Sequence, residues 1–265
     1  MDVESKTATQ GAQSLRRALA VLRLVAETQE RGIRLVELVE GTGLNRPTVH
    51  RMLQVLREEG VIEQDTESRR YRVGAELALL GMARGNRFPI RGVAETFLYE
   101  LAAKVGDTVF LTIRQGGDSI AIERVTGHYP IQVLATETGV RRPLGAGVAG
   151  VAILASLPPE EAAALASANA RRLARLGMTT AGLQARVKEA RTLGYAWAPV
   201  GLVPNTSAVA APIVDEQGNP LAAVTIAAMT DRLSERRLGP AVSALRDTAQ
   251  RIARRRSELE RRRAR

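Results

Sequence analysis

Between Leu15 and Gly74 the chain carries three helical segments and a hairpin in close succession, and this order constrains the fold most strongly. Leucines at helical spacing predict a first amphipathic helix over residues 15–27. Residues 36–40 predict a short second helix, which ends at the glycine-containing turn 41–43. This turn leads into a third element.

That third element is a helix predicted to begin after Asn45, because Asn is a good N-cap and Pro47 fits the first helical turn. Two β-prone runs, 61–64 and 70–73, are joined by the polar residues 65–69 and predict a hairpin. The complete order is typical of a winged helix-turn-helix. The buried face of the third helix is formed by apolar residues at helical spacing: Val49, Met52, Leu53 and Leu56.

The opposite face of the third helix is polar and points outward. Long donors in the first half of such a helix reach guanine O6 and N7 or phosphates in the major groove. Arginines at the tip of the hairpin would meet phosphates or the adjacent minor groove. Ordinary solvated side chains are the alternative, but the helix-turn before and the hairpin after favour recognition. The predicted DNA-contacting residues are Arg46, Pro47, Thr48, His50, Arg51, Gln54, Arg69 and Arg70.

Net charge gives weaker support for DNA binding than these positions do. The chain has a formal net charge of +10, but residues 251–265, with eight arginines and two glutamates, contribute +6 of it. The basic tail, residues 257–265, is either a solvated, frayed helix end or a further contact to nucleic acid.

From residue 89 onward the pattern changes to helices mixed with antiparallel hairpins, which predicts an α/β (α+β) domain with one sheet rather than a doubly wound parallel sheet. Helices are expected at 90–105, 159–174, 181–193 and from 234 to the tail, and a further helix is expected to follow the glycine-rich turn 145–150 and to continue to residue 155. Strands are expected at 108–114, 119–125, 131–134, 195–198, 207–214 and 222–228.

A glycine-rich turn suggests a ligand site in this second domain. Gly145, Gly147 and Gly150 let backbone approach a ligand closely, and the helix that follows would favour an anionic group at its N-terminus. Arg141 and Arg142 are adjacent cations. The alternative is that the glycines permit tight packing and the arginines are solvated.

Neither an enzyme nor a metal protein is indicated. The chain has no cysteine and two distant histidines, and it has no nucleophile elbow or P-loop. Residues 145–150 fit a dinucleotide fingerprint only loosely, because no βαβ unit with a following acidic residue accompanies them. No cofactor is expected. No apolar run is long enough to span a bilayer and no signal peptide is evident, so a cytoplasmic protein is expected.

Several strings resemble the isocitrate lyase regulator (IclR) family of bacterial transcription factors. In the first domain they are residues 13–22 (QSLRRALAVL), 43–53 (GLNRPTVHRML) and 71–74 (YRVG). In the second they are residues 143–150 (PLGAGVAG), 194–195, 211–212 and 231–233. The resemblance extends in order over nearly the whole chain.

The resemblance implies a winged helix-turn-helix domain (12–74), a linker helix (75–89), a GAF-like effector domain (90–256) and the basic tail. It also implies a repressor or activator that forms a homodimer through its N-terminal domain, with dimers able to pair into a homotetramer. Its DNA partner would be a palindromic or near-palindromic operator. A small metabolite, commonly an organic or aromatic acid, would modulate binding. An architectural nucleic-acid binder without ligand control, or an uncharacterised enzyme, is the alternative.

By position, the resemblance also places the walls of the effector pocket. Gly145 stands where a histidine is usual, and small apolar residues stand where some members have Asp, Cys or Ser. A more apolar or aromatic effector is therefore expected. The predicted effector-contacting residues are Gly147, Val148, Ala149, Trp197, Ala198, Ala208, Thr225 and Ala227.

Overall fold

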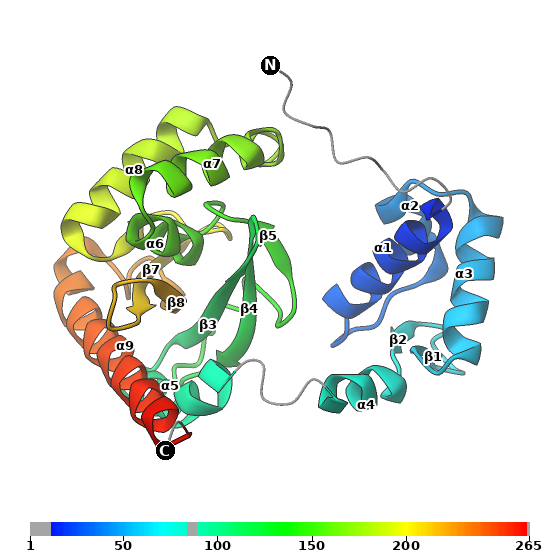
Figure 1. The fold of residues 1–265 in the computed structure, drawn as a ribbon, viewed down its shortest axis with the longest axis horizontal. Coiled ribbons are helices and arrows are strands. Elements are labelled where there is room, and N and C mark those ends of the chain that lie inside the picture. Colours follow the sequence, from blue (N-terminus) through cyan, green and yellow to red (C-terminus); the bar gives the residue numbers. More distant parts are fainter. Residues whose placement is uncertain (1–11, 84–88, 264–265) are drawn as a thin grey trace. The chain divides into compact units, whose positions relative to one another are not determined.

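The structure of the chain is a computed structural model that describes residues 12–83 and 89–263. The chain divides into two units, residues 1–87 and 88–265 (Figure 1). Each unit has its own apolar core and is described by itself.

The N-terminal unit contains three helices, a two-stranded wing and a further helix, as the sequence predicts. In chain order these are α1 (Gln13–Glu27), α2 (Leu35–Thr42), α3 (Arg46–Glu58), β1 (Ile62–Gln64), β2 (Tyr71–Val73) and α4 (Ala75–Ala83). Buried apolar side chains from α1, α2, α3 and the wing form one core, which includes Val21, Val25, Leu38, Val49, Leu53 and Ile62. This core fixes α3 against the other helices through one face and leaves the other face outside.

Capping residues set the two ends of the turn between α2 and α3. The side chain of Asn45 accepts a hydrogen bond from the backbone N–H of Thr48 at 2.9 Å, and a proline follows in the first turn, as expected. Gly43 ends α2 with φ +67°, a left-handed conformation that favours glycine. The prediction of a helix over 36–40 was too short, because α2 continues through Gly41 and Thr42 to this cap.

The C-terminal unit is built on one six-stranded antiparallel sheet with strand order β5-β4-β3-β8-β7-β6. The strands are β3 (Thr108–Gln115), β4 (Asp118–Val125), β5 (Arg141–Pro143), β6 (Ala196–Ala198), β7 (Thr206–Val214) and β8 (Pro220–Met229). The edge strand β5 was not predicted, whereas the strand predicted at 131–134 is wrong. Those residues form a loop in which the Gln132 side chain donates hydrogen bonds to the carbonyls of Gly106 and Tyr129.

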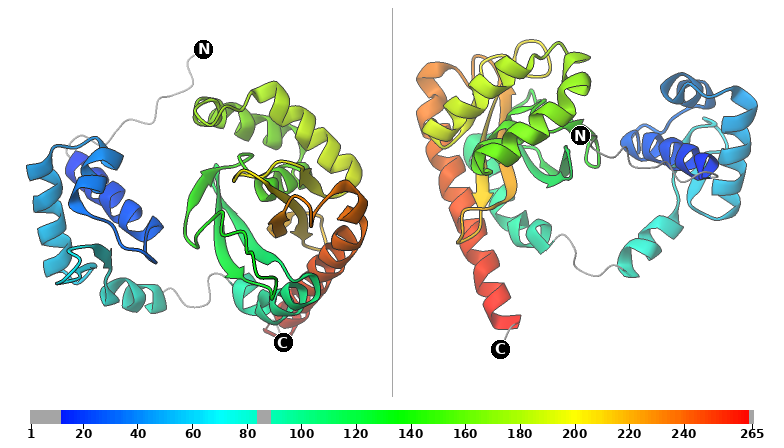
Figure 2. Two further views of the ribbon diagram at one scale, coloured as in Figure 1. Left: turned by 180° about the vertical axis from the view of Figure 1, so that it is seen from behind. Right: turned by 45° about the horizontal axis from the view of Figure 1, so that its top comes forward.

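Helices cover both faces of this sheet (Figure 2). One face packs against α5 (Pro89–Val105) and α9 (Glu235–Arg263), and the other against α6 (Val148–Ser156), α7 (Pro159–Ala174) and α8 (Thr180–Leu193). Successive side chains of β7 point to opposite faces of the sheet. Val209 and Ala211 therefore belong to the core under α5 and α9, and Ala210 belongs to the core under α6, α7 and α8.

The arginine-rich end of the chain continues the last helix. Ile252 of α9 is still fully buried, and the helix extends through residues 257–263. Several of its arginines form ion pairs, including Arg251 with Glu100 and Arg256 with Glu260. The predicted linker helix 75–89 is partly described: α4 covers 75–83, residues 84–88 lie outside the described residues, and α5 begins at Pro89.

Candidate functional site

The outer face of α3 presents the predicted DNA-contacting side chains to solvent. Arg46, Pro47, His50, Arg51 and Gln54 are exposed, and Thr48 is half-buried at the start of the helix. Their spacing follows from the burial of Val49 and Leu53, which holds the polar positions on the opposite side. The face combines two guanidiniums with shorter hydrogen-bonding groups, which is the mixture that base-edge and phosphate contacts require.

The two wing arginines differ in their surroundings. Arg69 is exposed and adopts φ +56°, at the turn just before β2. Arg70 is half-buried, and its Nη1 donates to the Gly32 carbonyl at 2.8 Å and lies 3.4 Å from the Glu37 carboxylate. The guanidinium of Arg70 therefore joins the wing to the start of α2, whereas Arg69 is available to a ligand outside the unit.

Glu37 organises this corner of the N-terminal unit. Its carboxylate accepts hydrogen bonds from the backbone N–H of Arg34 at 2.9 Å and from the Arg31 side chain at 2.6 Å. Both hydrogen bonds hold the pKa of Glu37 below its ordinary value. The hydrogen bond from the Arg34 N–H has the larger effect, and the one from the Arg31 guanidinium has the next largest. The carboxylate thus stabilises the N-terminus of α2.

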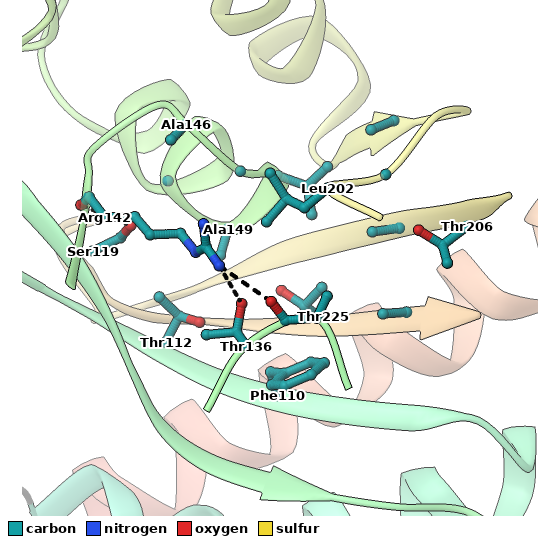
Figure 3. A pocket seen from close by; sticks show the side chains of 18 of the residues that line it. Phe110, Thr112, Ser119, Thr136, Arg142, Ala146, Ala149, Leu202, Thr206 and Thr225 are labelled. Atoms are coloured by element: carbon teal, nitrogen blue, oxygen red, sulfur yellow. Dashed lines mark hydrogen bonds between the residues drawn. The ribbon is translucent and has the colours of Figure 1, made fainter. Parts of the chain in front are cut away.

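The C-terminal unit contains a cavity of about 550 Å³, large enough for a small organic molecule. It lies on the α6 side of the sheet, with the loop before β5 and the segment before β7 completing its walls (Figure 3). Residues from β3, β4 and β8 form its floor, among them Phe110, Thr112 and Thr225. All eight residues predicted to contact an effector line this cavity: Gly147, Val148, Ala149, Trp197, Ala198, Ala208, Thr225 and Ala227.

The first turn of α6 opens into the cavity. Gly147 is the N-cap and has no side chain with which to cap the helix, so backbone N–H groups of the first turn are left for another acceptor. The other two glycines serve packing. Gly145 has φ +102°, and a Cβ there would meet Leu183 at 2.8 Å, while a Cβ on Gly150 would meet the Gly145 nitrogen at 2.6 Å.

Two buried, uncharged side-chain groups in the cavity wall have no hydrogen-bond partner within the described part of the chain: the Thr225 hydroxyl and the Trp197 indole N–H. Thr225 is 6% exposed. By contrast, the Thr206 hydroxyl donates to the Val203 carbonyl at 2.6 Å, and the Ser207 hydroxyl to the Pro199 carbonyl at 2.8 Å. Buried polar groups are usually hydrogen-bonded, so the two partnerless groups are positions where a ligand would add a contact.

Of the two adjacent arginines, only Arg142 reaches the cavity. Arg141 does not line it and pairs with Asp118 at 3.1 Å. Nη2 of Arg142 donates to the Ala135 carbonyl at 3.1 Å and lies 3.4 Å from the Thr136 hydroxyl, as Figure 3 shows. Arg142 thereby ties the edge strand to the loop that closes one side of the cavity.

A second arginine in the wall, Arg186 of α8, was missed from the sequence. Burial lowers the pKa of its guanidinium, and Glu189 one turn later partly offsets this effect. The inward face of α8 is formed by Leu183, Val187 and Ala190 at helical spacing. An arginine at position 186 falls on that face, three residues after Leu183, and this was the signal that could have found it.

The described residues contain no group of His, Cys, Asp and Glu side chains that could hold a metal ion. Among the helices described, none is long and apolar enough to cross a membrane.

Comparison with protein families matches both units. Residues 14–66 match the IclR helix-turn-helix domain, and residues 82–254 match the family described as bacterial transcriptional regulator IclR C-terminal. The glycerol operon regulatory protein of Streptomyces coelicolor is 33% identical over 245 residues, covering 91% of this chain and 95% of that protein. The transcriptional regulator KipR of Bacillus subtilis is 31% identical over 226 residues, covering 83% of this chain and 88% of KipR.

Solved structures share the fold. An IclR transcriptional regulator from Alicyclobacillus acidocaldarius gives a TM-score of 0.69 at 26% identity, covering 91% of this chain and 98% of that one. An IclR homologue from Microbacterium hydrocarbonoxydans, solved with 4-hydroxybenzoate, gives a TM-score of 0.70 at 22% identity, covering 92% of this chain and 98% of that one.

Proposed function

Because the chain belongs to the IclR family of bacterial transcriptional regulators, we propose that its α3 helix reads a palindromic operator as part of a dimer and that a small organic acid in the cavity controls this binding. The family consists of regulators with a helix-turn-helix DNA-binding domain and a C-terminal effector-binding domain, not of enzymes. We propose three further properties of this chain: the residues of α3 that contact DNA, a palindromic operator, and an organic acid as the effector.

The cavity is the observation that carries the proposal. Its walls are mostly apolar, they include a helix N-terminus with uncapped N–H groups, and two partnerless donors face it. An acid with a small apolar body matches this lining, because its carboxylate accepts from the helix N-terminus while its body contacts the alanine-rich walls. The acid 4-hydroxybenzoate, bound by the Microbacterium protein, is a suitable first probe.

Exposed apolar side chains on the N-terminal unit support dimerisation. Leu15 of α1 is 63% exposed, and Leu79, Leu80 and Met82 of α4 are exposed as well. A second copy of the chain would bury these side chains. A two-fold dimer places two α3 helices on two half-sites, so the operator would be palindromic or nearly so.

Footprinting on DNA upstream of the gene tests the DNA-reading part. Arg46→Ala and Arg51→Ala should each abolish or weaken the protected site, whereas a chain shortened at residue 256 should retain it. If only the shortened chain lost protection, the recognition role of α3 would be wrong, and binding by the basic end of α9 would replace it. Adding 4-hydroxybenzoate and related acids to the same assay tests the effector part.

A further inference from the structure

Arg186 is a half-buried cation on the wall of the cavity with no hydrogen bond or ion pair among the described residues. The other arginine in the wall, Arg142, is already hydrogen-bonded to the loop that closes the cavity. The only acidic side chain among the described lining residues is Glu189, which is exposed and lies beyond ion-pair distance of Arg186. Arg186 is therefore the lining cation whose guanidinium is open to a ligand.

Leaving such a group partly desolvated is unfavourable. A guanidinium stays charged in proteins, so it cannot relieve the cost of burial by losing its proton. Arg186 is half-buried, so water solvates its guanidinium incompletely, and this burial lowers its pKa. A desolvated cation without a partner is stabilised when an anion binds beside it.

The position of α8 brings this cation to the same cavity as the start of α6. Leu183 packs against Gly145, two residues before the N-cap of α6. Arg186 is one turn further along the same face of α8 and lines the cavity together with Gly147 and Ala149. A carboxylate at the α6 N-terminus would thus bind in a cavity whose wall also supplies a guanidinium.

We propose that Arg186 is the residue that selects an effector with a carboxylate, by pairing with that carboxylate through its guanidinium. This rests on the proposed function, since it names the group that would distinguish an acid from a neutral molecule of the same shape. Arginine suits the role because its planar fork can donate two parallel hydrogen bonds to one carboxylate. The sequence of the glycine-rich turn does not indicate this role, because Arg186 lies on α8 and not in the turn.

The test compares acids with their neutral amides on the full chain. Benzoate, phenylacetate and 4-hydroxybenzoate, each beside the corresponding amide, are titrated by calorimetry into the wild type and into Arg186→Gln. The variant should bind each acid roughly tenfold to hundredfold more weakly, the loss expected for a hydrogen-bonded charged partner. Its affinity for the amides should stay unchanged. The affinity of Arg186→Lys for the acids should lie between those of the wild type and Arg186→Gln, because lysine keeps the charge but cannot donate two parallel hydrogen bonds.

Lys188→Gln is the matched control, since it removes one positive charge from an exposed position of α8 that does not line the cavity. It should bind the acids as the wild type does. Arg186→Met, measured without ligand, should unfold at the same or a higher temperature than the wild type, because an unpaired cation is replaced by an apolar chain. A lower unfolding temperature would indicate a structural role and would overturn the proposal.

Two further outcomes separate this inference from the proposed function. If acids bind the wild type and Arg186→Gln equally well, the role of Arg186 is wrong while the acid effector stands. If none of these acids binds the wild type, the acid effector and the role of Arg186 both fail.

Discussion

The Arg232 guanidinium holds the Asp107 carboxylate with two hydrogen bonds, of 2.7 and 3.0 Å, across 125 positions of sequence. Arg232 also donates to the Val105 carbonyl at 3.1 Å and stacks over the Tyr129 ring at 3.8 Å. Asp107 is 7% exposed and immediately precedes β3, and Arg232 follows β8. The pair therefore joins the adjacent ends of the two central strands.

Arg232→Ala should destabilise the chain by about 2–4 kcal/mol, because it leaves the Asp107 carboxylate buried without its charged partner. Chemical denaturation of the full chain measures the loss. The double variant Arg232→Leu with Asp107→Leu should recover part of the stability, since neither charge then remains buried. A single variant as stable as the wild type would contradict the role given to this pair.

Asn45→Ala should lower stability by about 1 kcal/mol, the usual cost of losing an N-cap hydrogen bond. The hydrogen bond from Thr48 N–H to Asn45 is lost, so the first turn of α3, which carries Arg46 and Thr48, should fray and DNA affinity should fall as well. Asn45→Asp is the control, because aspartate caps equally well. Equal stability of the alanine and aspartate variants would show that the cap contributes little.

Arg51→Ala should reduce operator affinity by about 1–3 kcal/mol if its side chain reads a base, and its loss should relax the sequence preference at one position of each half-site. If it contacts a phosphate instead, affinity should fall on all sequences alike, with a smaller salt dependence. Electrophoretic mobility shifts at several salt concentrations distinguish the two. Arg175→Ala, at an exposed position after α7, should leave DNA binding unchanged.

The stability contribution of Glu37 should depend on pH. Its pKa lies below the ordinary value of 4.5, so its contribution is present above that value and is lost as the pH falls through the lowered pKa. Glu37→Gln should therefore unfold at a lower temperature than the wild type at pH 6, and the difference should shrink towards pH 3. Thermal unfolding of both full chains across this range checks the sign. A difference that grew on acidification would refute it.

Thr225→Val should leave the stability of the ligand-free chain unchanged or raise it slightly, because the hydroxyl it removes has no partner among the described residues. Thr206→Val is the matched comparison, since its hydroxyl donates to Val203 at 2.6 Å, and it should cost about 1 kcal/mol. Denaturation curves of the two variants provide the measurement. A loss at Thr225 as large as at Thr206 would mean that its hydroxyl already has a partner.

The sequence predicted most of the elements whose signals are local. Asn45, Pro47 and the apolar positions of α3 define that helix within one segment, and the two predicted strands 207–214 and 222–228 correspond to the long hairpin of β7 and β8. Most of the cavity wall followed from the resemblance of the second domain to a known family, while Gly147 and Trp197 were predicted from the residues themselves, and all eight predicted residues line the cavity.

What was missed depends on contacts between distant segments. Residues 131–134 read as a strand but are held in a loop by Gln132, whose side chain bonds to Gly106. The strand β5 exists because β4 provides an edge for it, and three residues carry no periodicity of their own. Arg186 was overlooked because an isolated arginine in a helix usually faces solvent, although its spacing from Leu183 places it on the face of α8 that packs over α6.

The small side chains around the cavity have a consequence for how this protein can diversify. Its walls include Ala146, Ala149, Ala198, Ala208 and Ala227, supplied by the turn before α6, by α6 itself and by three strands that other residues hold in place. The cavity exists because the side chains in its walls are short, not because the backbone segments around it are separated. A single nucleotide change at any of these codons can therefore reshape the chamber while the surrounding framework persists, so related bacteria could acquire responses to new compounds by point mutation alone.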